Sequence, residues 1–263
     1  MSSNLTRGTV SGRCHSLIVY TAHDRAAALA QLARGSSLSQ VSRETGINRS
    51  TLRTWRAAPP WPGECPRCDE VQLASTAYAA LLGYYLGDGC LSRAPRYWYL
   101  RVSCDATYPR VVDDITRLIL GVRPGGKVHL VRAPGVVVVQ SNWQHWLCLF
   151  PQHGPGRKHE RPIALERWQE LIVEEHPAAF LRGLFHSDGC RAANWTRRPV
   201  AGRMKRYDYP RWQFTNVSVD IREVCCWALD LVDVAWRQSH WKTISVSRRD
   251  AVARLDGLIG PKG

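Results

Sequence analysis

The chain has 263 residues, which suffices for one large domain and one small one. Its hydrophobic content of 44% is typical of a protein with a core, and its apolar runs are too short for a transmembrane helix. The net charge of +14 favours a polyanionic partner, nucleic acid first and an acidic membrane surface second. The polar N-terminus lacks a secretory apolar segment, so we expect an intracellular protein, cytoplasmic and, if bacterial, nucleoid-associated.

Nine cysteines are spaced irregularly, which does not suggest a disulfide framework, so we expect free thiols in a reducing compartment. Cys65 and Cys68 have the spacing of zinc ligands, but one such pair is half of a site. The other seven cysteines contain no second C-x-x-C, and no pair of histidines lies nearby in the sequence. The sequence therefore leaves zinc open at this pair and favours its absence.

In chain order, residues 1–20 read as a flexible tail and residues 21–57 as a helical unit. Its segments AHDRAAALAQLARG and SLSQVSRETG end at Gly35 and Gly46, and NRSTLRTWR begins at the predicted N-cap Asn48. Two short helices joined by a glycine-containing turn, the second one basic, form the helix-turn-helix pattern. The Pro-rich residues 58–72, which contain Cys65 and Cys68, read as a linker.

This unit resembles the DNA-binding domains of transposases and resolvases, in which the second helix of the motif enters the major groove. Arg reads guanine and Asn reads adenine through paired hydrogen bonds. The residues expected to contact DNA are Asn48, Arg49, Ser50, Thr51 and Arg53. Leu52 and Trp55 are expected in the small core. The alternative is a helical hairpin that binds protein.

Two stretches exactly one hundred residues apart repeat each other: LLGYYLGDGC at 81–90 and LRGLFHSDGC at 181–190 agree at five of ten positions. Strand-like segments follow near 90–94 and 98–104, and near 190–197 and 209–217. A helix, two more strands and closing helical material come next in both cases. The pattern predicts an α+β domain over 73–263, with two pseudo-symmetric αββαββα halves at about 73–170 and 171–263.

Each repeat brings a carboxylate, Asp88 or Asp188, to the end of an apolar helix, where the helix dipole disfavours negative charge. A cation between them would make the arrangement favourable, and hard divalent ions such as Mg²⁺ or Mn²⁺ take carboxylate oxygens. Gly83 and Gly183 allow two helices to approach closely. Gly89 and Gly189 suit a left-handed turn at a helix end. The alternative is an ordinary Asp-Gly turn, which explains one copy better than two.

Both stretches resemble the LAGLIDADG motif of homing endonucleases. The resemblance implies a saddle-shaped pair of antiparallel sheets in the DNA major groove, and metals bound by Asp88 and Asp188 at the scissile phosphates. It also implies a monomer with internal pseudo-twofold symmetry that makes a staggered double-strand break. The chain departs from the motif at Leu86 and His186, where the family has an earlier Asp. His186 is either a supporting polar group or a packed interface histidine.

The resemblance also suggests supporting residues in each half. A polar residue at the end of a strand corresponds to Asn216 in the second half, near Gln213, and to Cys104 or Asp105 in the first. A late lysine corresponds to Lys158 and Lys262, where a cation could orient water or stabilise phosphate charge. The alternative for both lysines is a plain surface charge.

Residues 191–211 carry seven Lys or Arg and one acid, interleaved with Trp and Tyr. As a hairpin, this segment would present a basic surface suited to DNA, and the alternative is a solvated loop. The residues expected at the DNA are Arg197, Arg198, Lys205, Arg206 and Arg211. Two functions fit: a metal-dependent DNA endonuclease, or a non-cleaving transcriptional regulator with the same fold. The retained aspartate pair favours the first.

Overall fold

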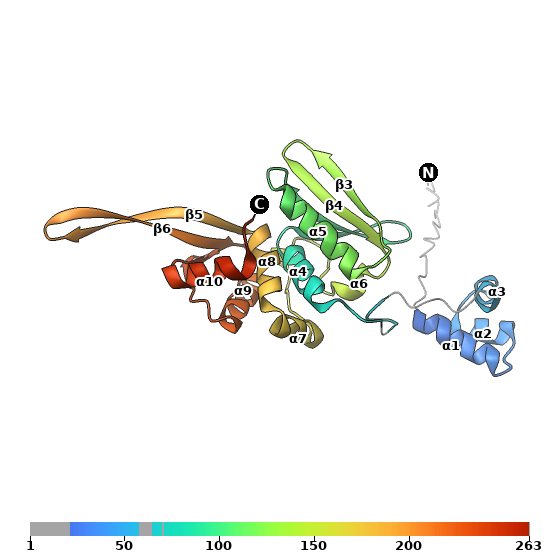
Figure 1. The fold of residues 1–263 in the computed structure, drawn as a ribbon. Helices are drawn as coiled ribbons and strands as arrows, with labels where there is room; N and C mark the ends of the chain where they lie inside the picture. Colours follow the sequence, from blue (N-terminus) through green and yellow to red (C-terminus); the bar gives the residue numbers. More distant parts are fainter. Residues whose placement is uncertain (1–21, 58–64, 70, 263) are drawn as a thin grey trace, which may run out of the picture. The chain divides into compact units, whose positions relative to one another are not determined.

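The computed structural model describes residues 22–57, 65–69 and 71–262, which fall into two compact units (Figure 1). The described residues of the first unit end at Ala57, and those of the second begin at Cys65. The predicted tail at 1–20 and residues 58–64 and 70 of the predicted linker lie outside the described residues. Among the described helices, none combines the length and the apolar character that a membrane span requires.

The first unit consists of α1 (Ala22–Ala33), α2 (Leu38–Thr45) and α3 (Arg49–Ala57). The Ser37 hydroxyl caps α2 by accepting a hydrogen bond from the Gln40 backbone N–H at 3.2 Å. Gly46 ends the same helix in the left-handed region, with φ of 70°. The small core comprises Ala28, Val41, Ile47 and Leu52, with Leu32, Leu38 and Trp55 packed against it. The predictions for Leu52 and Trp55 are confirmed.

The second unit repeats one order of elements twice, and the predicted αββαββα halves of an α+β fold are confirmed. The first half contains α4 (Ser75–Leu86), β1 (Gly89–Arg93), β2 (Trp98–Asp105), α5 (Pro109–Val122), β3 (Val128–Ala133), β4 (Val136–Trp143) and α6 (Trp146–Leu149). The second contains α8 (Pro177–Ser187), β5 (Gly189–Val200), β6 (Arg203–Thr215), α9 (Val219–Leu231), β7 (Arg237–His240), β8 (Thr243–Val246) and α10 (Arg249–Ile259). The 3₁₀ turn η1 (Lys158–Glu160) and α7 (Arg167–Glu175) connect them.

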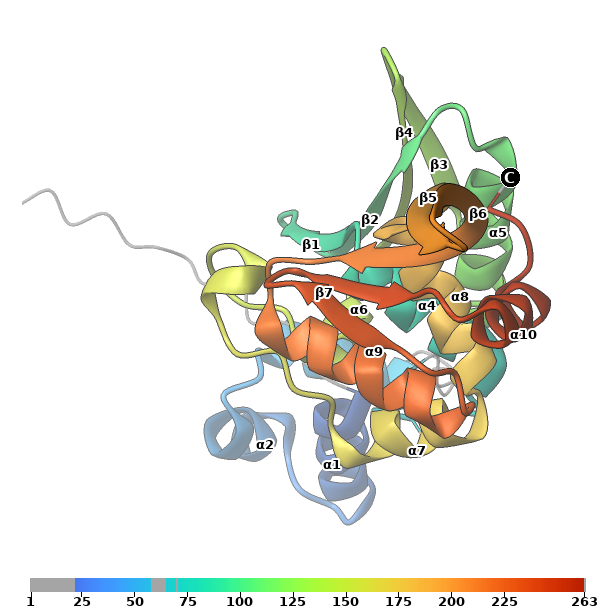
Figure 2. The ribbon, with the colours of Figure 1, turned by 90° about the vertical axis from the view of Figure 1, so that its left-hand side faces the viewer.

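Each half forms a four-stranded antiparallel sheet, with the orders β1-β2-β4-β3 and β5-β6-β8-β7. Helix α5 packs on β2 and β4, while α9 packs on β8 and α10 on β6 (Figure 2). The alternation of buried and accessible residues along β4 shows that one face of its sheet meets the core and the other is open. The two open faces are the surfaces available to a large partner.

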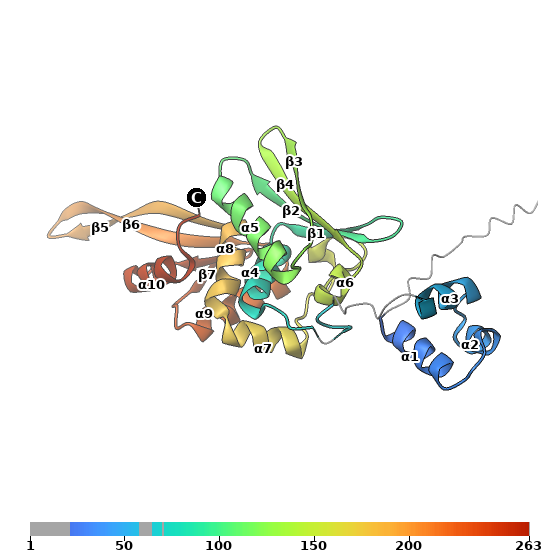
Figure 3. The same cartoon turned by 45° about the vertical axis from the view of Figure 1, so that its right-hand side comes forward.

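Helices α4 and α8 lie side by side between the two sheets (Figures 1 and 3). All residues of α4 from Tyr78 to Leu86 are buried, as expected for a helix that is apolar on every side. The two helices cross at Gly83 and Gly183. A Cβ on Gly83 would lie 2.3 Å from the Phe180 carbonyl oxygen, and one on Gly183 would lie 2.1 Å from the Ala80 carbonyl oxygen. The predicted close approach at these glycines is confirmed.

Gly89 and Gly189 are needed for a different reason from the predicted one. Neither has a positive φ, so the expected left-handed turn is wrong. A Cβ on Gly89 would lie 2.4 Å from the Tyr85 Cα, and one on Gly189 would lie 2.3 Å from the Phe185 carbonyl oxygen. Each glycine begins a strand that turns back tightly over the end of its own helix, and a side chain would collide there.

The β5–β6 hairpin is longer than the sequence indicates. Its strands have 12 and 13 residues, whereas β1 and β2 have 5 and 8. The sequence indicated strands near 190–197 and 209–217, whereas the two strands of the structure stay paired as far as Val200 and Arg203. Ala201 and Gly202, with φ of 48° and 77°, form the two-residue turn. The hairpin extends well beyond its sheet (Figure 1).

Candidate active site

The two predicted metal-binding aspartates lie at adjacent ends of the helix pair. Asp88 follows Gly87, which is the C-cap residue of α4, and Asp188 is the C-cap residue of α8. A Cβ on Gly87 would lie 3.4 Å from the Asp188 Cγ, so the end of α4 reaches the carboxyl group of the second repeat. Asp88 is exposed and Asp188 is half-buried. The fold therefore brings together two carboxylates that stand one hundred residues apart.

The protein disfavours two negative charges at this position. Burial, and after it the charge of Asp88, raises the pKa of Asp188 to about 6, against the lowering effect of Asn216, Lys158 and Lys262. Partial loss of solvation also raises the pKa of Asp88, opposed by the two lysines. A divalent cation between the carboxylates would relieve this repulsion.

The donor atoms suit a hard cation. The Asn216 side-chain N–H donates to Asp188 Oδ2 at 2.6 Å, which leaves Oδ1 as a ligand atom. A hollow of about 230 Å³ opens beside Asp88, lined also by Cys104, Asp105 and Lys262. Carboxylate oxygens next to space for water and a phosphate oxygen are the environment that Mg²⁺ and Mn²⁺ prefer. The residues present therefore fit such an ion.

Both predicted lysines are at this site, and each binds backbone carbonyl groups at the end of its own helix. Lys158 Nζ donates to the carbonyl oxygens of Tyr85, Leu86 and Gly87 at 2.7, 2.8 and 2.6 Å. Lys262 Nζ donates to the carbonyl oxygens of Ser187 and Gly189 at 3.0 and 2.8 Å, and so makes the equivalent contacts at the end of α8. These bonds use all three donors of Lys158 and two of the three of Lys262.

The two lysines also counter the charge of the aspartates. Burial lowers the pKa of Lys158 to about 8, against the raising effect of Asp188 and then Asp88. Burial likewise lowers the pKa of Lys262, against Asp88 first among the charges that raise it. Each lysine therefore interacts most strongly with the aspartate of the other half. A plain surface charge, the alternative for both, does not describe these positions.

Strand register makes Cys104 the counterpart of Asn216. Gly89 pairs with Val102 and Gly189 pairs with Phe214, so the residues two positions further on are equivalent. The Asp88 carbonyl accepts the Ser103 N–H, and the Asp188 carbonyl accepts the Thr215 N–H, both at 3.3 Å.

The equivalent side chains differ in chemistry. Asn216 donates to Asp188, whereas Cys104 is buried with its sulfur 3.8 Å from the Val102 carbonyl oxygen. Burial, with the charge of Asp88, raises the pKa of Cys104 to about 12, so it is a neutral thiol. The carboxylates of the two halves therefore have unequal support.

His186 is a packed interface residue. It is buried, and its ring nitrogens lie 3.3 Å from the Tyr84 hydroxyl and 3.3 Å from the Gly260 carbonyl oxygen. The Tyr84 hydroxyl in turn donates to Asp114 at 3.1 Å. Burial lowers the pKa of His186, which favours the neutral ring. Of the two alternatives for this residue, the geometry supports the interface role, and Leu86 is buried as well.

All five predicted basic residues of the second half lie on the β5–β6 hairpin. Arg197 pairs directly with Arg206 across the strands, and Arg198 pairs with Lys205. The two arginines of the first pair also lie over the Trp195 ring, at 5.6 and 5.2 Å from its centroid. Like charges directly opposite each other destabilise a hairpin, so this surface suits a polyanion. Arg211 lies further down β6 and is half-buried.

The far part of this hairpin has no face that meets the core. Trp195 is 52% exposed and Met204 is 64% exposed. Arg206 is ion-paired with Asp208 at 2.7 Å, and Lys205 lies 5.5 Å from the centroid of the Tyr207 ring. Basic and aromatic groups therefore stand on both faces of the ribbon, available to a partner.

The predicted DNA-contacting residues of the first unit stand at the start of α3. Asn48 caps this helix, because its Oδ1 accepts from the Ser50 N–H and hydroxyl, both at 2.9 Å. Arg49 donates to the Ser39 hydroxyl at 3.4 Å. Arg53 is exposed and Thr51 is half-buried. The Asn48 oxygen is thus already used, which leaves its amide N–H groups for another partner.

Sequence reasoning missed the polar rows on the open sheet faces. In the first sheet the row is Cys90, Arg101, Gln140 and His129, and in the second it is Cys190, Gln213 and Arg237. Ser245, which lies between Gln213 and Arg237 in the second row, is buried. The two rows occupy equivalent positions. The alternation of apolar and polar residues in LRVSCD, which contains Arg101, and in WQFT, which contains Gln213, was the available signal.

Sequence reasoning also underestimated the cysteine pair. Cys65 and Cys68 lie beside His145 and Cys148, and one ligand atom of each residue lies within 4.8 Å of the others. The second half of the group is thus H-x-x-C, a spacing that a search for C-x-x-C or two histidines does not detect. The expectation that the pair lacks further ligands is wrong.

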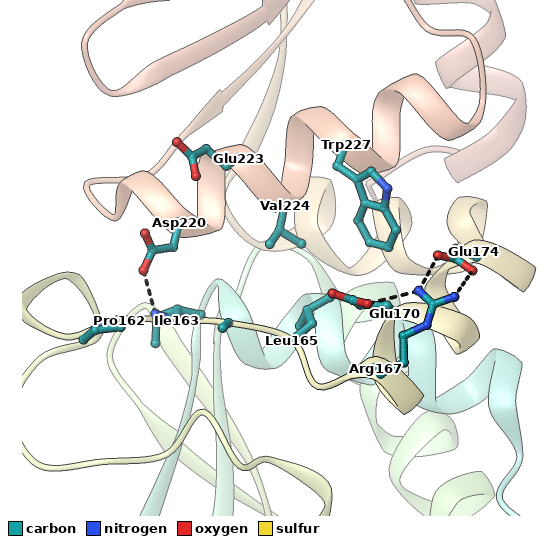
Figure 4. Close-up of a pocket in the computed structure, with 11 residues that line it drawn as sticks. Pro162, Ile163, Leu165, Arg167, Glu170, Glu174, Asp220, Glu223, Val224 and Trp227 are labelled. Carbon is teal, nitrogen blue, oxygen red and sulfur yellow. Dashed lines mark hydrogen bonds and ion pairs between the residues drawn. The ribbon is translucent and has the colours of Figure 1, made fainter.

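A cleft of about 730 Å³ lies away from the aspartates, between residues 162–167 and helices α7 and α9 (Figure 4). Its lining is rich in acids, including Glu170, Glu174 and Glu223. Arg167 donates to the first two of these at 3.1 and 2.9 Å. Carboxylates repel phosphate groups, so this cleft does not suit nucleic acid.

No protein-family model matches the chain, and no curated protein matches it in sequence. Among solved structures it is similar to mesophilic variants of the homing endonuclease I-DmoI, with 13% identity and a TM-score of 0.46 over 71% of this chain and 97% of that one. The LAGLIDADG meganuclease I-AabMI bound to uncleaved DNA has 13% identity and a TM-score of 0.43, over 69% and 82%. The homing endonuclease I-WcaI bound to its DNA recognition sequence has 12% identity and a TM-score of 0.43, over 73% of this chain and 84% of that one. At these identities the likeness concerns the fold.

Proposed function

We propose that the protein is a site-specific DNA endonuclease that needs a divalent metal. The observation that carries the proposal is the meeting of Asp88 and Asp188 at the ends of two helices that cross at glycines. Structural stability gives no reason to bring two carboxylates to this point, since the pKa of both is raised there. Metal-dependent cleavage of a phosphodiester does give a reason.

In the proposed reaction the two aspartates hold Mg²⁺ or Mn²⁺. The bound ion would lower the pKa of a water molecule and neutralise charge that develops on the phosphate. Asn216 orients Asp188 through its 2.6 Å hydrogen bond. Lys158 and Lys262 fix the two helix ends and keep positive charge beside the carboxylates, which favours the ionised state that a metal needs.

DNA binding is proposed for the open sheet faces, the β5–β6 hairpin and the first unit. Arg197, Arg198, Lys205 and Arg206 would bind phosphates, and the polar rows with Arg101 and Gln140 would read base edges. The net charge of +14 supports this assignment, because DNA is a polyanion. Helix α3 with Arg49 and Arg53 would add a separate contact to DNA, as the helix-turn-helix pattern suggests.

The test uses the full chain and a supercoiled plasmid library with random inserts, in Mg²⁺ or Mn²⁺. The expected product is linear DNA from a subset of plasmids, whose ends give the target site. Asp88→Asn and Asp188→Asn should each abolish linear product and retain binding. Asp113→Asn is the matched control, because this residue is exposed on α5.

The neutral Cys104 in the position of Asn216 favours a second function, that of a regulator which binds DNA and does not cut it. For such a protein, a footprint at specific sites would form equally with and without Mg²⁺, and the aspartate variants would leave it unchanged. Binding with that behaviour, and intact plasmid throughout the library, would overturn the endonuclease proposal.

A further inference from the structure

We propose that Cys65, Cys68, His145 and Cys148 form a structural zinc site. The four side chains come from two short stretches, C-x-x-C before α4 and H-x-x-C at the start of α6. Their ligand atoms lie within 4.8 Å of one another. Three thiols and one imidazole are a usual ligand set for structural zinc. The inference does not depend on the proposed nuclease function.

The distances match the edges of a zinc tetrahedron. Bond lengths of about 2.3 Å for sulfur and about 2.0–2.1 Å for nitrogen place two sulfur ligands about 3.8 Å apart, and a sulfur and a nitrogen about 3.5 Å apart. The sulfur atoms of Cys68 and Cys148 are 3.5 Å apart. His145 Nδ1 lies 3.6 Å from the first and 3.7 Å from the second. The side chains are therefore already arranged around one point.

The surroundings supply the support that a zinc site needs. The Cys65 backbone is fixed in a turn, because its carbonyl oxygen accepts from the N–H groups of Cys68 and Asp69 at 3.2 and 2.8 Å, and its own N–H donates to Asp69 Oδ2 at 2.8 Å. His145 Nε2 lies 2.9 Å from the side-chain amide of Gln144. With Nδ1 on the metal, Nε2 carries the proton, and a rotated amide can accept it through its oxygen.

Two of the four ligand residues, Cys65 and His145, are buried, and Cys68 and Cys148 are half-buried. Cys65 is fully buried, and His145 is buried with its ring 5.3 Å from the Trp143 centroid. Arg67 lies over the Trp168 ring at 4.6 Å, so the loop between the two cysteines is held against the core from its other side. Four protein ligands leave no coordination position of a tetrahedral ion open, which indicates a structural metal and not a catalytic one.

The ligand set distinguishes this site from the aspartate pair. Thiolates select zinc over magnesium, whereas the oxygen ligands of Asp88 and Asp188 select the harder ion. The zinc would join ligands 77 to 83 residues apart in the sequence and attach residues 65–69 to the first half. The zinc would thereby fix the start of the larger unit, at residues 65–69, to the rest of that unit.

The experiment measures zinc in the full chain, purified with reductant and desalted, by elemental mass spectrometry. We expect about one zinc ion per chain, retained by Asp88→Asn. Cys148→Ser should lose most of it. His145→Cys, which replaces one ligand by another, should keep it. Cys226→Ser is the matched control, because this half-buried cysteine on α9 lies outside the group.

A measurement on the unmodified chain keeps the proposal testable if Cys148→Ser does not fold. A mercurial reagent should release zinc to a metal-sensitive dye, and Co²⁺ in its place should show intense thiolate-to-cobalt absorption. Protein that holds no zinc and takes up neither ion after reduction would overturn the proposal. A disulfide between Cys68 and Cys148 in freshly purified protein, seen as a mass lower by two hydrogens, would also overturn it.

Discussion

Replacement of Gly183 by alanine should destabilise the second unit, because the added methyl group has no space at the helix crossing. Its carbon would lie 2.1 Å from the Ala80 carbonyl oxygen and 2.8 Å from the Tyr84 backbone nitrogen. The first contact is about 1.3 Å shorter than an ordinary one, and both neighbours are backbone atoms that cannot rotate away. Helices α4 and α8 must therefore move apart.

The expected magnitude combines two opposed effects. Overpacking costs about 1–3 kcal/mol, and contact with backbone places this case at about 3. Alanine in place of glycine in a helix stabilises by about 1 kcal/mol. The net loss is about 2 kcal/mol, which lowers the melting temperature of a unit of this size by about 4–8 °C.

Gly257 provides the matched control. It lies in α10, and an added Cβ would meet no atom within 4 Å. Gly257→Ala should therefore be stabilised only by the higher helix propensity of alanine, by about 1 kcal/mol. It should melt about 2–4 °C higher than the unmodified protein. Thermal unfolding followed by far-ultraviolet circular dichroism measures both. A Gly183→Ala protein that melts as high as the Gly257→Ala protein would refute the close crossing.

Three further outcomes follow from the site and the hairpin. Affinity for Mn²⁺ should be constant above about pH 6 and should fall about tenfold per pH unit below it, because the pKa of Asp188 is about 6 and protons compete with the metal. In calorimetric titrations Lys158→Met should move that midpoint to higher pH, and an unchanged midpoint would contradict the charge coupling. Arg198→Ala and Lys205→Ala should each reduce the slope of log affinity against log salt by about 0.9, without a change in sequence preference. Strand-labelled substrate should show one strand cut before the other, and Asn216→Cys should slow the faster cut, whereas equal rates in the unmodified protein would contradict the asymmetry.

Local sequence patterns could predict the order of the elements and the position of the aspartates. The repeat at an offset of one hundred residues aligned α4 with α8, and glycines at matching positions indicated where the two helices touch. The predicted end of the strand at 209–217 was enough to identify Asn216 as the polar residue of the second half. The period-2 alternation of a strand then makes Cys104 its equivalent, since both stand two residues beyond the partner of a motif glycine.

Features that depend on long-range contacts could not be predicted in the same way. His145 and Cys148 join Cys65 and Cys68 only through the tertiary fold, across nearly a third of the chain. The need for Gly89 arises from how tightly β1 turns over the end of α4, which local propensity does not contain. Lys158 was expected to act on water or phosphate, and only its position shows that carbonyl groups occupy its donors.

The unequal hairpins have a consequence for the length of duplex that each half can follow. At about 3.3 Å per residue the 12 residues of β5 span about 40 Å, slightly more than one turn of B-DNA. The 5 residues of β1 span about 16 Å, near half a turn. A target bound by both sheets would therefore be lopsided about its cleavage point, with the longer arm on the side of β5 and β6.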